Sequence, residues 1–183
     1  MDVFIVIDIQ QAYFKDRVQH NVDNALERIN SVSNYFQRQQ KPVFFIQHDG
    51  DGINTAAPHT DGWQLYTALQ VADSDIVVRK ILNDAFAYTT LHEQLKKCDA
   101  SRLVISGWAT DFCVDSTIRS AVNLGYDLVI LSDCHMVTDR PSLSAQQVID
   151  YHNWLWGNLI APKSSITLST AAEYLSLSAA KSL

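Results

Sequence analysis

The chain has 183 residues, of which 47% are hydrophobic and 19% charged, with 6 glycines and 4 prolines. This composition is typical of a globular domain and excludes disordered, collagen-like and low-complexity proteins. A net charge of −6 argues against a nucleic-acid partner, because binding to phosphates depends on clustered Lys and Arg. We therefore expect a single domain over residues 1–183, with a frayed tail at residues 176–183.

The cysteine pattern and the N-terminal segment predict the cellular compartment. The chain has three widely spaced cysteines, Cys98, Cys113 and Cys134. An odd, scattered set fits free thiols in a reducing compartment better than a disulfide framework. The first residues include no basic region and no apolar run long enough for a signal peptide or a membrane span. We therefore expect a cytoplasmic protein with no membrane partner.

Short runs rich in β-branched residues predict six strands. They cover residues 3–8, 42–48, 75–80, 102–107, 127–132 and, more weakly, 165–168. Apolar residues at helical spacing from Val22 to Phe36 predict a helix between the first two strands. Three capping boxes predict further helix starts: Thr90 with Glu93, Ser144 with Gln147, and Thr170 with Glu173. This alternation predicts an α/β fold with a mostly parallel sheet covered on both faces. The irregular residues 49–62 are either a surface excursion or a lid.

Polar residues follow the predicted strands at the edge where such sheets bind ligands. Ligands of open parallel sheets bind beyond the carboxyl ends of the strands. Asp8, His48 and Lys80 close three predicted strands, and Cys113 and Asp133 lie just beyond two others. No glycine-rich turn follows the first strand, which argues against nucleotide binding.

Cys113 lies in the most informative segment of the sequence. A predicted strand ends at Gly107, and an apolar stripe from Val114 predicts a helix that ends at Gly125. Cys113 then lies in the first turn, where free amides favour a thiolate and could hold an oxyanion. A single such cysteine could equally be a small core residue. Together with the Asp8 carboxylate and the Lys80 ammonium, however, the thiol forms a set suited to nucleophilic catalysis.

Several motifs, in the same order along the chain, resemble the isochorismatase-like cysteine hydrolases. They are Val6-Ile7-Asp8-Ile9-Gln10 with Tyr13-Phe14, Val78-Arg79-Lys80 with Ala85-Phe86, and Gly107-Trp108-Ala109-Thr110 with Cys113-Val114. The resemblance implies a three-layer α/β/α domain with a parallel six-stranded sheet in the order 3-2-1-4-5-6. It also implies a catalytic triad of Asp8, Lys80 and Cys113.

The resemblance assigns a role to each member of the triad. Asp8 would act as general base and then acid, Cys113 would attack an amide carbonyl to form an acyl-enzyme, and Lys80 would stabilise both charges. The backbone amides of Ala109 and Cys113 would form the oxyanion hole, with a cis peptide bond between Trp108 and Ala109. Aromatic side chains would line the site of a small planar substrate, unless they only pack in the core: Tyr13, Phe14, Trp63 and Trp108.

Departures from the family pattern bear on metals and cofactors. The His48-Asp49-Gly50 segment and His59 invert and shorten the metal-binding Asp-x-His element of nicotinamidases, so we expect no metal and no cofactor. The other histidines are expected on the surface or in packing: His20, His92, His135 and His152. Cys98 and Cys134 are expected to be structural thiols.

Three functions stay open at this point. The presence of Cys113 favours hydrolysis of a C–N bond in a small amide or ureido compound. Hydrolysis of a vinyl ether, as in isochorismatases, needs an Asp and no thiol. A catalytically silent interaction module is the third possibility, since the aromatic helix at residues 151–156 is apolar on more than one face. That helix also predicts a homo-oligomer, a dimer or tetramer.

Overall fold

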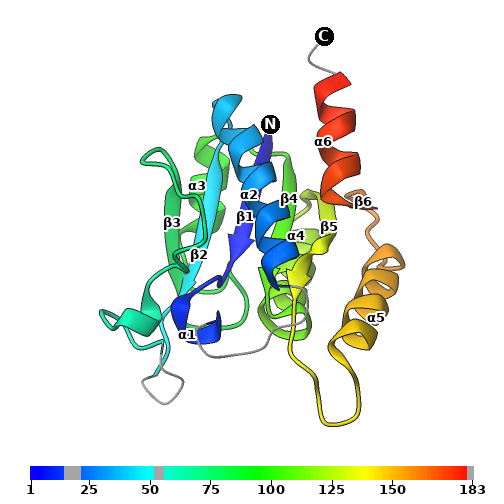
Figure 1. Cartoon of the computed structure of the whole chain (residues 1–183). Coiled ribbons are helices and arrows are strands. Elements are labelled where there is room, and N and C mark those ends of the chain that lie inside the picture. Colours follow the sequence, from blue (N-terminus) through cyan, green and yellow to red (C-terminus); the bar gives the residue numbers. More distant parts are fainter. Residues whose placement is uncertain (15–21, 52–55, 181–183) are drawn as a thin grey trace.

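Six strands lie parallel in a single sheet, in the order β3-β2-β1-β4-β5-β6 (Figure 1). The structure is a computed structural model that describes residues 1–14, 22–51 and 56–180. The strands are β1 (Asp2–Ile7), β2 (Val43–His48), β3 (Ile76–Lys80), β4 (Arg102–Trp108), β5 (Asp127–Met136) and β6 (Ile166–Ser169). The strand order that the resemblance implied is confirmed.

Helices cover both faces of the sheet. The helical segments are α1 (Gln11–Phe14), α2 (Val22–Arg38), η1 (Asp61–Trp63), α3 (Leu91–Lys97), η2 (Thr110–Val114), α4 (Asp115–Asn123), α5 (Ala145–Gly157) and α6 (Ala171–Ala180). Alternate residues of β1 face opposite sides of the sheet, so Phe4 packs in the core beneath α2 and α6. Ile5 packs instead in the core beneath α3, α4 and Trp156 of α5. The three-layer arrangement is therefore present (Figure 1). No described helix is long and apolar enough to cross a membrane.

Two of the three predicted capping boxes form. Ser144 and Gln147 bond reciprocally at the start of α5, and Thr170 and Glu173 do so at the start of α6. The expected box at Thr90 is wrong, because Thr90 has φ −87° and ψ 2° rather than the extended conformation of an N-cap. Its hydroxyl instead accepts a bond from Gln94 Nε2 at 2.6 Å.

Three segments differ from the sequence-based expectations. β5 continues to Met136 rather than ending at residue 132, because β4 resumes pairing with it after an irregularity beyond Ile105. The described part of the expected frayed tail is helical, since α6 continues to Ala180 after Ala171 and Tyr174 pack in the core. Residues 181–183 lie outside the described residues, as do residues 52–55 of the expected excursion.

Candidate active site

Asp8, Lys80 and Cys113 meet at the carboxyl edge of the sheet. Lys80 Nζ lies 2.6 Å from Asp8 Oδ2 and 3.3 Å from Cys113 Sγ. It also donates to the carbonyl of Leu82 at 2.9 Å, so each of the three N–H groups of the ammonium has a partner. The Lys80 and Asp8 side chains are 0% and 1% exposed. A carboxyl, an ammonium and a thiol therefore lie in contact at one place that is buried from solvent.

Local backbone geometry brings Asp8 and Lys80 to this position. Asp8 directly follows β1 and has φ 51°, a left-handed conformation that Asp tolerates better than most residues. Its amide donates to the Ile46 carbonyl at 3.0 Å, which keeps it beside β2. Lys80 is the last residue of β3, and its carbonyl accepts a bond from Asp49 at 2.7 Å.

A glycine and a tight turn carry the thiol to the same place. Gly107 has φ +135°, and a Cβ there would lie 2.4 Å from the Ile7 carbonyl oxygen, so only glycine lets β4 approach β1 this closely. The Trp108–Ala109 peptide bond is cis. The chain then forms the π-helical turn η2, in which the Ala109 carbonyl accepts bonds from Phe112 and Val114. Cys113 lies in this turn, directly before α4, rather than in the first α-helical turn.

Burial and mutual contact shift the pKa values of the three groups. Burial and the nearby Asp8 charge raise the pKa of the Cys113 thiol, and Lys80 opposes this only in part. Burial also raises the pKa of the Asp8 carboxyl, although Lys80 and Cys113 act to lower it. Burial alone would lower the pKa of Lys80, but Asp8 and Cys113 outweigh it and the net shift is upward. The resting form of Cys113 is therefore a thiol, not the thiolate that its place near a helix start predicted.

Sequence analysis missed a fourth side chain at the sulfur. Asn83 Oδ1 lies 3.6 Å from Cys113 Sγ, on the segment that follows β3. That segment is held against α4 because the Ala85 amide donates to Thr117 Oγ1 at 3.1 Å. No periodic pattern marks residues 81–90, and the only signal for Asn83 is its place just after Lys80.

The four aromatic residues expected at the site separate into two groups. Tyr13 stacks on Trp108 with ring centroids 4.3 Å apart, and Phe14 meets the edge of Trp108 at 6.4 Å. Tyr13 and Phe14 also belong to the core beneath α2. The Trp63 ring makes different contacts: its indole N–H donates to Asp49 Oδ1 at 2.8 Å, and Arg79 covers its ring.

Unpaired polar atoms gather at the same edge. Among the described residues, buried side-chain atoms without a partner of ordinary hydrogen-bond geometry include Asp8 Oδ1, His48 Nδ1 and Trp108 Nε1. Buried polar atoms are rarely left unpaired, so these three mark places where the hydrogen bonding is incomplete. Burial and the Lys80 charge lower the pKa of His48, which favours its neutral form. In the described part of the chain, no group of three or more His, Cys, Asp or Glu is arranged to hold a metal ion.

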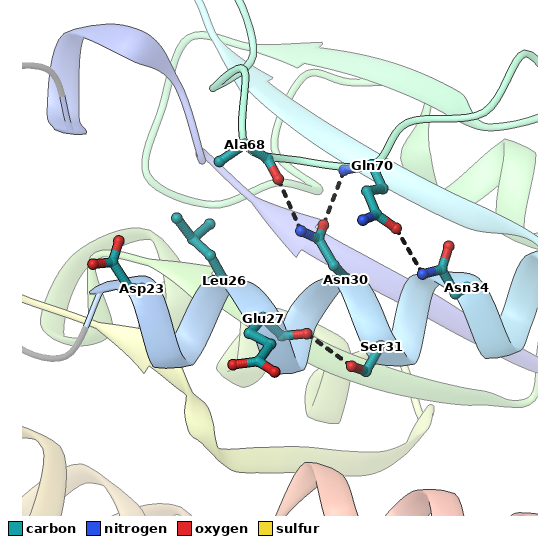
Figure 2. A pocket seen from close by; sticks show the side chains of 8 residues that line it. All are labelled: Asp23, Leu26, Glu27, Asn30, Ser31, Asn34, Ala68 and Gln70. Atoms are coloured by element: carbon teal, nitrogen blue, oxygen red, sulfur yellow. Dashed lines mark hydrogen bonds between the residues drawn. The ribbon is translucent and has the colours of Figure 1, made fainter.

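A hollow elsewhere on the surface lacks such chemistry. It lies between α2 and the segment at residues 68–70 (Figure 2). Asn30 donates to the Ala68 carbonyl and accepts from the Gln70 amide, and Asn34 donates to the Gln70 side chain. These bonds join the segment to the helix, and the described residues that line the hollow include no cysteine, lysine or histidine.

Comparisons with known proteins agree with the fold. The chain matches the Isochorismatase domain over residues 2–159. It is 28% identical over 150 residues to the isochorismatase family protein YddQ of Bacillus subtilis, covering 80% of each chain. It is also 28% identical over 143 residues to a streptothricin hydrolase of Streptomyces noursei, covering 78% of this chain and 57% of that one. A solved structure of an isochorismatase family protein superposes with a TM-score of 0.82 at 26% identity, covering 90% of this chain and 96% of that one. The chain therefore belongs to the isochorismatase family of hydrolases.

Proposed function

We propose that this chain is a cysteine hydrolase that cleaves the C–N bond of a small amide or ureido compound, with Cys113 as nucleophile. The observation that carries the proposal is that the Lys80 ammonium contacts both the Asp8 carboxylate and the Cys113 sulfur in a buried position. The hydrolase name of the Streptomyces noursei relative supports hydrolysis, although this chain spans 57% of that protein.

The first half of the reaction forms a thioester. As Sγ of Cys113 bonds to the substrate carbonyl carbon, its proton passes to Asp8, whose basicity is increased by burial. The amides of Ala109 and Cys113 hold the negative oxygen of the adduct. When the adduct collapses, the C–N bond breaks, and the leaving nitrogen takes the proton from Asp8.

The second half regenerates the enzyme. Asp8 takes a proton from water as the water oxygen adds to the thioester carbonyl. The C–S bond then breaks, an acid is released, and the sulfur recovers its proton. Lys80 does not act as a base, because its raised pKa keeps it charged; it stabilises whichever neighbour is anionic.

The aromatic residues support a small, planar substrate. The stacked Tyr13 and Trp108 rings present a flat apolar wall, and the unpaired indole N–H of Trp108 can donate to a substrate oxygen. Phe14 extends the same cluster. In the proposal Trp63 also lines the substrate site, from its place beside Asp49 and Arg79.

We further propose that the active form is a homo-oligomer joined through α5. Tyr151 and Trp154 of this helix are 54% and 62% exposed, which is unusual for aromatic residues on a free surface. Sedimentation should show a dimer or tetramer, and Trp154→Glu should reduce its mass to that of the monomer. A wild-type monomer would contradict this part of the proposal.

Ammonia release from a panel of small amides and ureido acids tests the chemistry. We expect turnover of at least one compound, and Cys113→Ala should lower kcat by at least about a thousandfold. Cys98→Ala, which removes a half-buried thiol from the end of α3, should leave the rate unchanged. Equal rates for Cys113→Ala and the parent would refute the nucleophile assignment. Turnover of a vinyl ether that needs Asp8 but not Cys113 would favour the isochorismatase reaction instead.

A further inference from the structure

His135 is a buried titratable residue that the proposed mechanism does not use. It is 3% exposed and lies on the continuation of β5, where it pairs with Gly107 of the strand that leads to the nucleophile. Its ring stands edge-on to Trp156 of α5 at 4.9 Å. Both ring nitrogens have side-chain partners, so the residue does more than fill space.

These partners connect α5 to the turn that carries Cys113. His135 Nε2 lies 3.0 Å from Asn153 Oδ1, and His135 Nδ1 lies 2.9 Å from Thr110 Oγ1. Thr110 is the first residue of the π-helical turn η2. A second bond from the same helix, Trp156 Nε1 to Asp115 Oδ1 at 2.9 Å, reaches the first residue after that turn. Residues 153 and 156 are three apart on α5 and share one face, so one helix holds both ends of the turn.

The positions of the protons follow from the chain of bonds. Asn153 Nδ2 donates to the Ser132 carbonyl at 3.1 Å, which orients its Oδ1 toward His135. Since Oδ1 can only accept, Nε2 of His135 carries the ring proton. The neutral ring then has a bare Nδ1, which accepts the hydroxyl proton of Thr110.

The Thr110 hydroxyl has two acceptors for its one proton. Besides His135 Nδ1, the Met136 carbonyl lies 3.0 Å from Oγ1. Burial lowers the pKa of His135 to about 4, with His152 lowering it and Asn153 and Asp133 acting to raise it. With the ring neutral, Nδ1 and the Met136 carbonyl both accept from the hydroxyl, and an unprotonated Nδ1 only 2.9 Å from Oγ1 requires that the hydroxyl proton lie at least partly between them. A protonated ring would instead donate to Oγ1 and turn the hydroxyl toward Met136.

We propose that His135 is a positioning residue: anchored by Asn153, its bare Nδ1 holds the Thr110 hydroxyl and thereby fixes the turn that presents Cys113 to its substrate. The catalytic consequence rests on the proposed function, whereas the positioning itself does not. Because a nucleophile displaced by about 1 Å can lose about a hundredfold in rate, loss of this bond should appear in kcat more than in KM.

A pair of substitutions at Thr110 isolates the hydroxyl. Thr110→Val keeps the shape and removes the bond, and it should lower kcat by about tenfold or more with little change in KM. Thr110→Ser keeps the hydroxyl and should recover most of the rate. The rate of Cys113 alkylation by iodoacetamide should follow the same order, and this readout needs no substrate. Equal kcat and equal alkylation in Thr110→Val and the parent would overturn the proposal.

A second pair of substitutions, in α5 and directly after it, tests the anchor. Asn153→Leu removes the acceptor of the Nε2 proton, whereas Asn158→Leu removes the side chain of the residue that follows α5, which donates to the Trp154 carbonyl at 2.7 Å. Nitrogen-15 NMR should show an unprotonated Nδ1 in the parent and in Asn158→Leu, and a mixture of tautomers with slower alkylation in Asn153→Leu. A parent protein with a protonated Nδ1 would overturn the proposal even if the amidase assignment held. A bare Nδ1 with no turnover of any amide would overturn only the proposed function.

Discussion

The buried pair of Asp8 and Lys80 allows a quantitative test of how completely the site excludes water. Lys80→Met leaves the Asp8 carboxyl without its cation, and Asp8→Asn leaves the ammonium without its anion. The double variant removes both charges and replaces them with neutral groups of similar size. The two single variants and the double variant therefore form a thermodynamic cycle around one contact.

The expected size of the effect follows from the geometry. The two charged atoms lie 2.6 Å apart with almost no exposure, and removing one partner of such a pair destabilises proteins by about 3–5 kcal/mol. At about 2–4 °C per kcal/mol for a domain of this size, either single variant should melt about 6–20 °C below the parent. The double variant should lie much closer to the parent, because no charge is left buried alone. Arg119→Met breaks an exposed pair with Asp115 on α4 and should cost only about 0.5 kcal/mol.

The pH dependence of the stability of Lys80→Met tests the direction of the Asp8 pKa shift. Without Lys80, burial raises the pKa of folded Asp8 further above its unfolded value, so the folded state binds a proton more readily. The stability of the variant should therefore be greatest at low pH relative to the parent, and it should fall as pH rises through the folded pKa of Asp8. Urea denaturation at several pH values measures this. A cost below about 1 kcal/mol at neutral pH would refute the reasoning, because it would mean that water reaches the pair.

Other positions give further expected outcomes. The pKa of folded His135 is lowered to about 4, so the free energy of unfolding should decrease by up to about 3 kcal/mol as pH falls from 6.5 toward 4. Denaturation of His135→Gln should show a smaller decrease over the same pH range. Gly107→Ala should destabilise by at least about 4 kcal/mol or prevent soluble expression, whereas Gly125→Ala, where a Cβ meets open space, should cost about 1 kcal/mol. Ser144→Ala should cost about 1 kcal/mol in thermal denaturation through the lost cap and leave kcat unchanged.

The sequence predicted the strands well because burial on both faces leaves continuous apolar runs. The run that became β1 begins and ends within one residue of its expected bounds. Local patterns cannot fix the order of strands, which depends on pairing between distant segments, and here the order came from the family resemblance. The extension of β5 to Met136 was missed for the same reason, since it depends on pairing with β4 beyond an irregularity.

The sequence predicted that three residues would meet at one edge of the sheet, but it did not predict their environment. Lys80 ends β3, Asp8 directly follows β1 and Cys113 lies in the turn after β4, and a parallel sheet brings such positions to one edge. The ionisation of the thiol was predicted from its place near a helix start, an effect worth about 1–2 kcal/mol at most. Burial is the larger influence on the Cys113 thiol, and burial depends on residues that are distant in the sequence, among them Asp8, Lys80 and Asn83.

His135 shows most clearly what a sequence pattern leaves out. A lone histidine without ligand spacing is expected on the surface or in packing, and nothing near it in the sequence marks Thr110 or Asn153 as partners. In the proposal His135 acts through the position of its single ring proton. The hydrogen bond from Nε2 to Asn153 sets that position and leaves Nδ1 bare.

The resting thiol has a consequence for the proposed chemistry. A permanent thiolate would be open to oxidation and alkylation at all times, because the thiolate is the reactive form of cysteine. In this site burial and Asp8 keep the sulfur protonated, and the charge on sulfur develops only as Asp8 accepts the proton. Catalysis then depends on how closely the turn holds Cys113 to its substrate and to Asp8. In the proposed mechanism, the hydrogen bonds that fix that turn from α5 therefore affect the rate as directly as Asp8, Lys80 and Cys113 do.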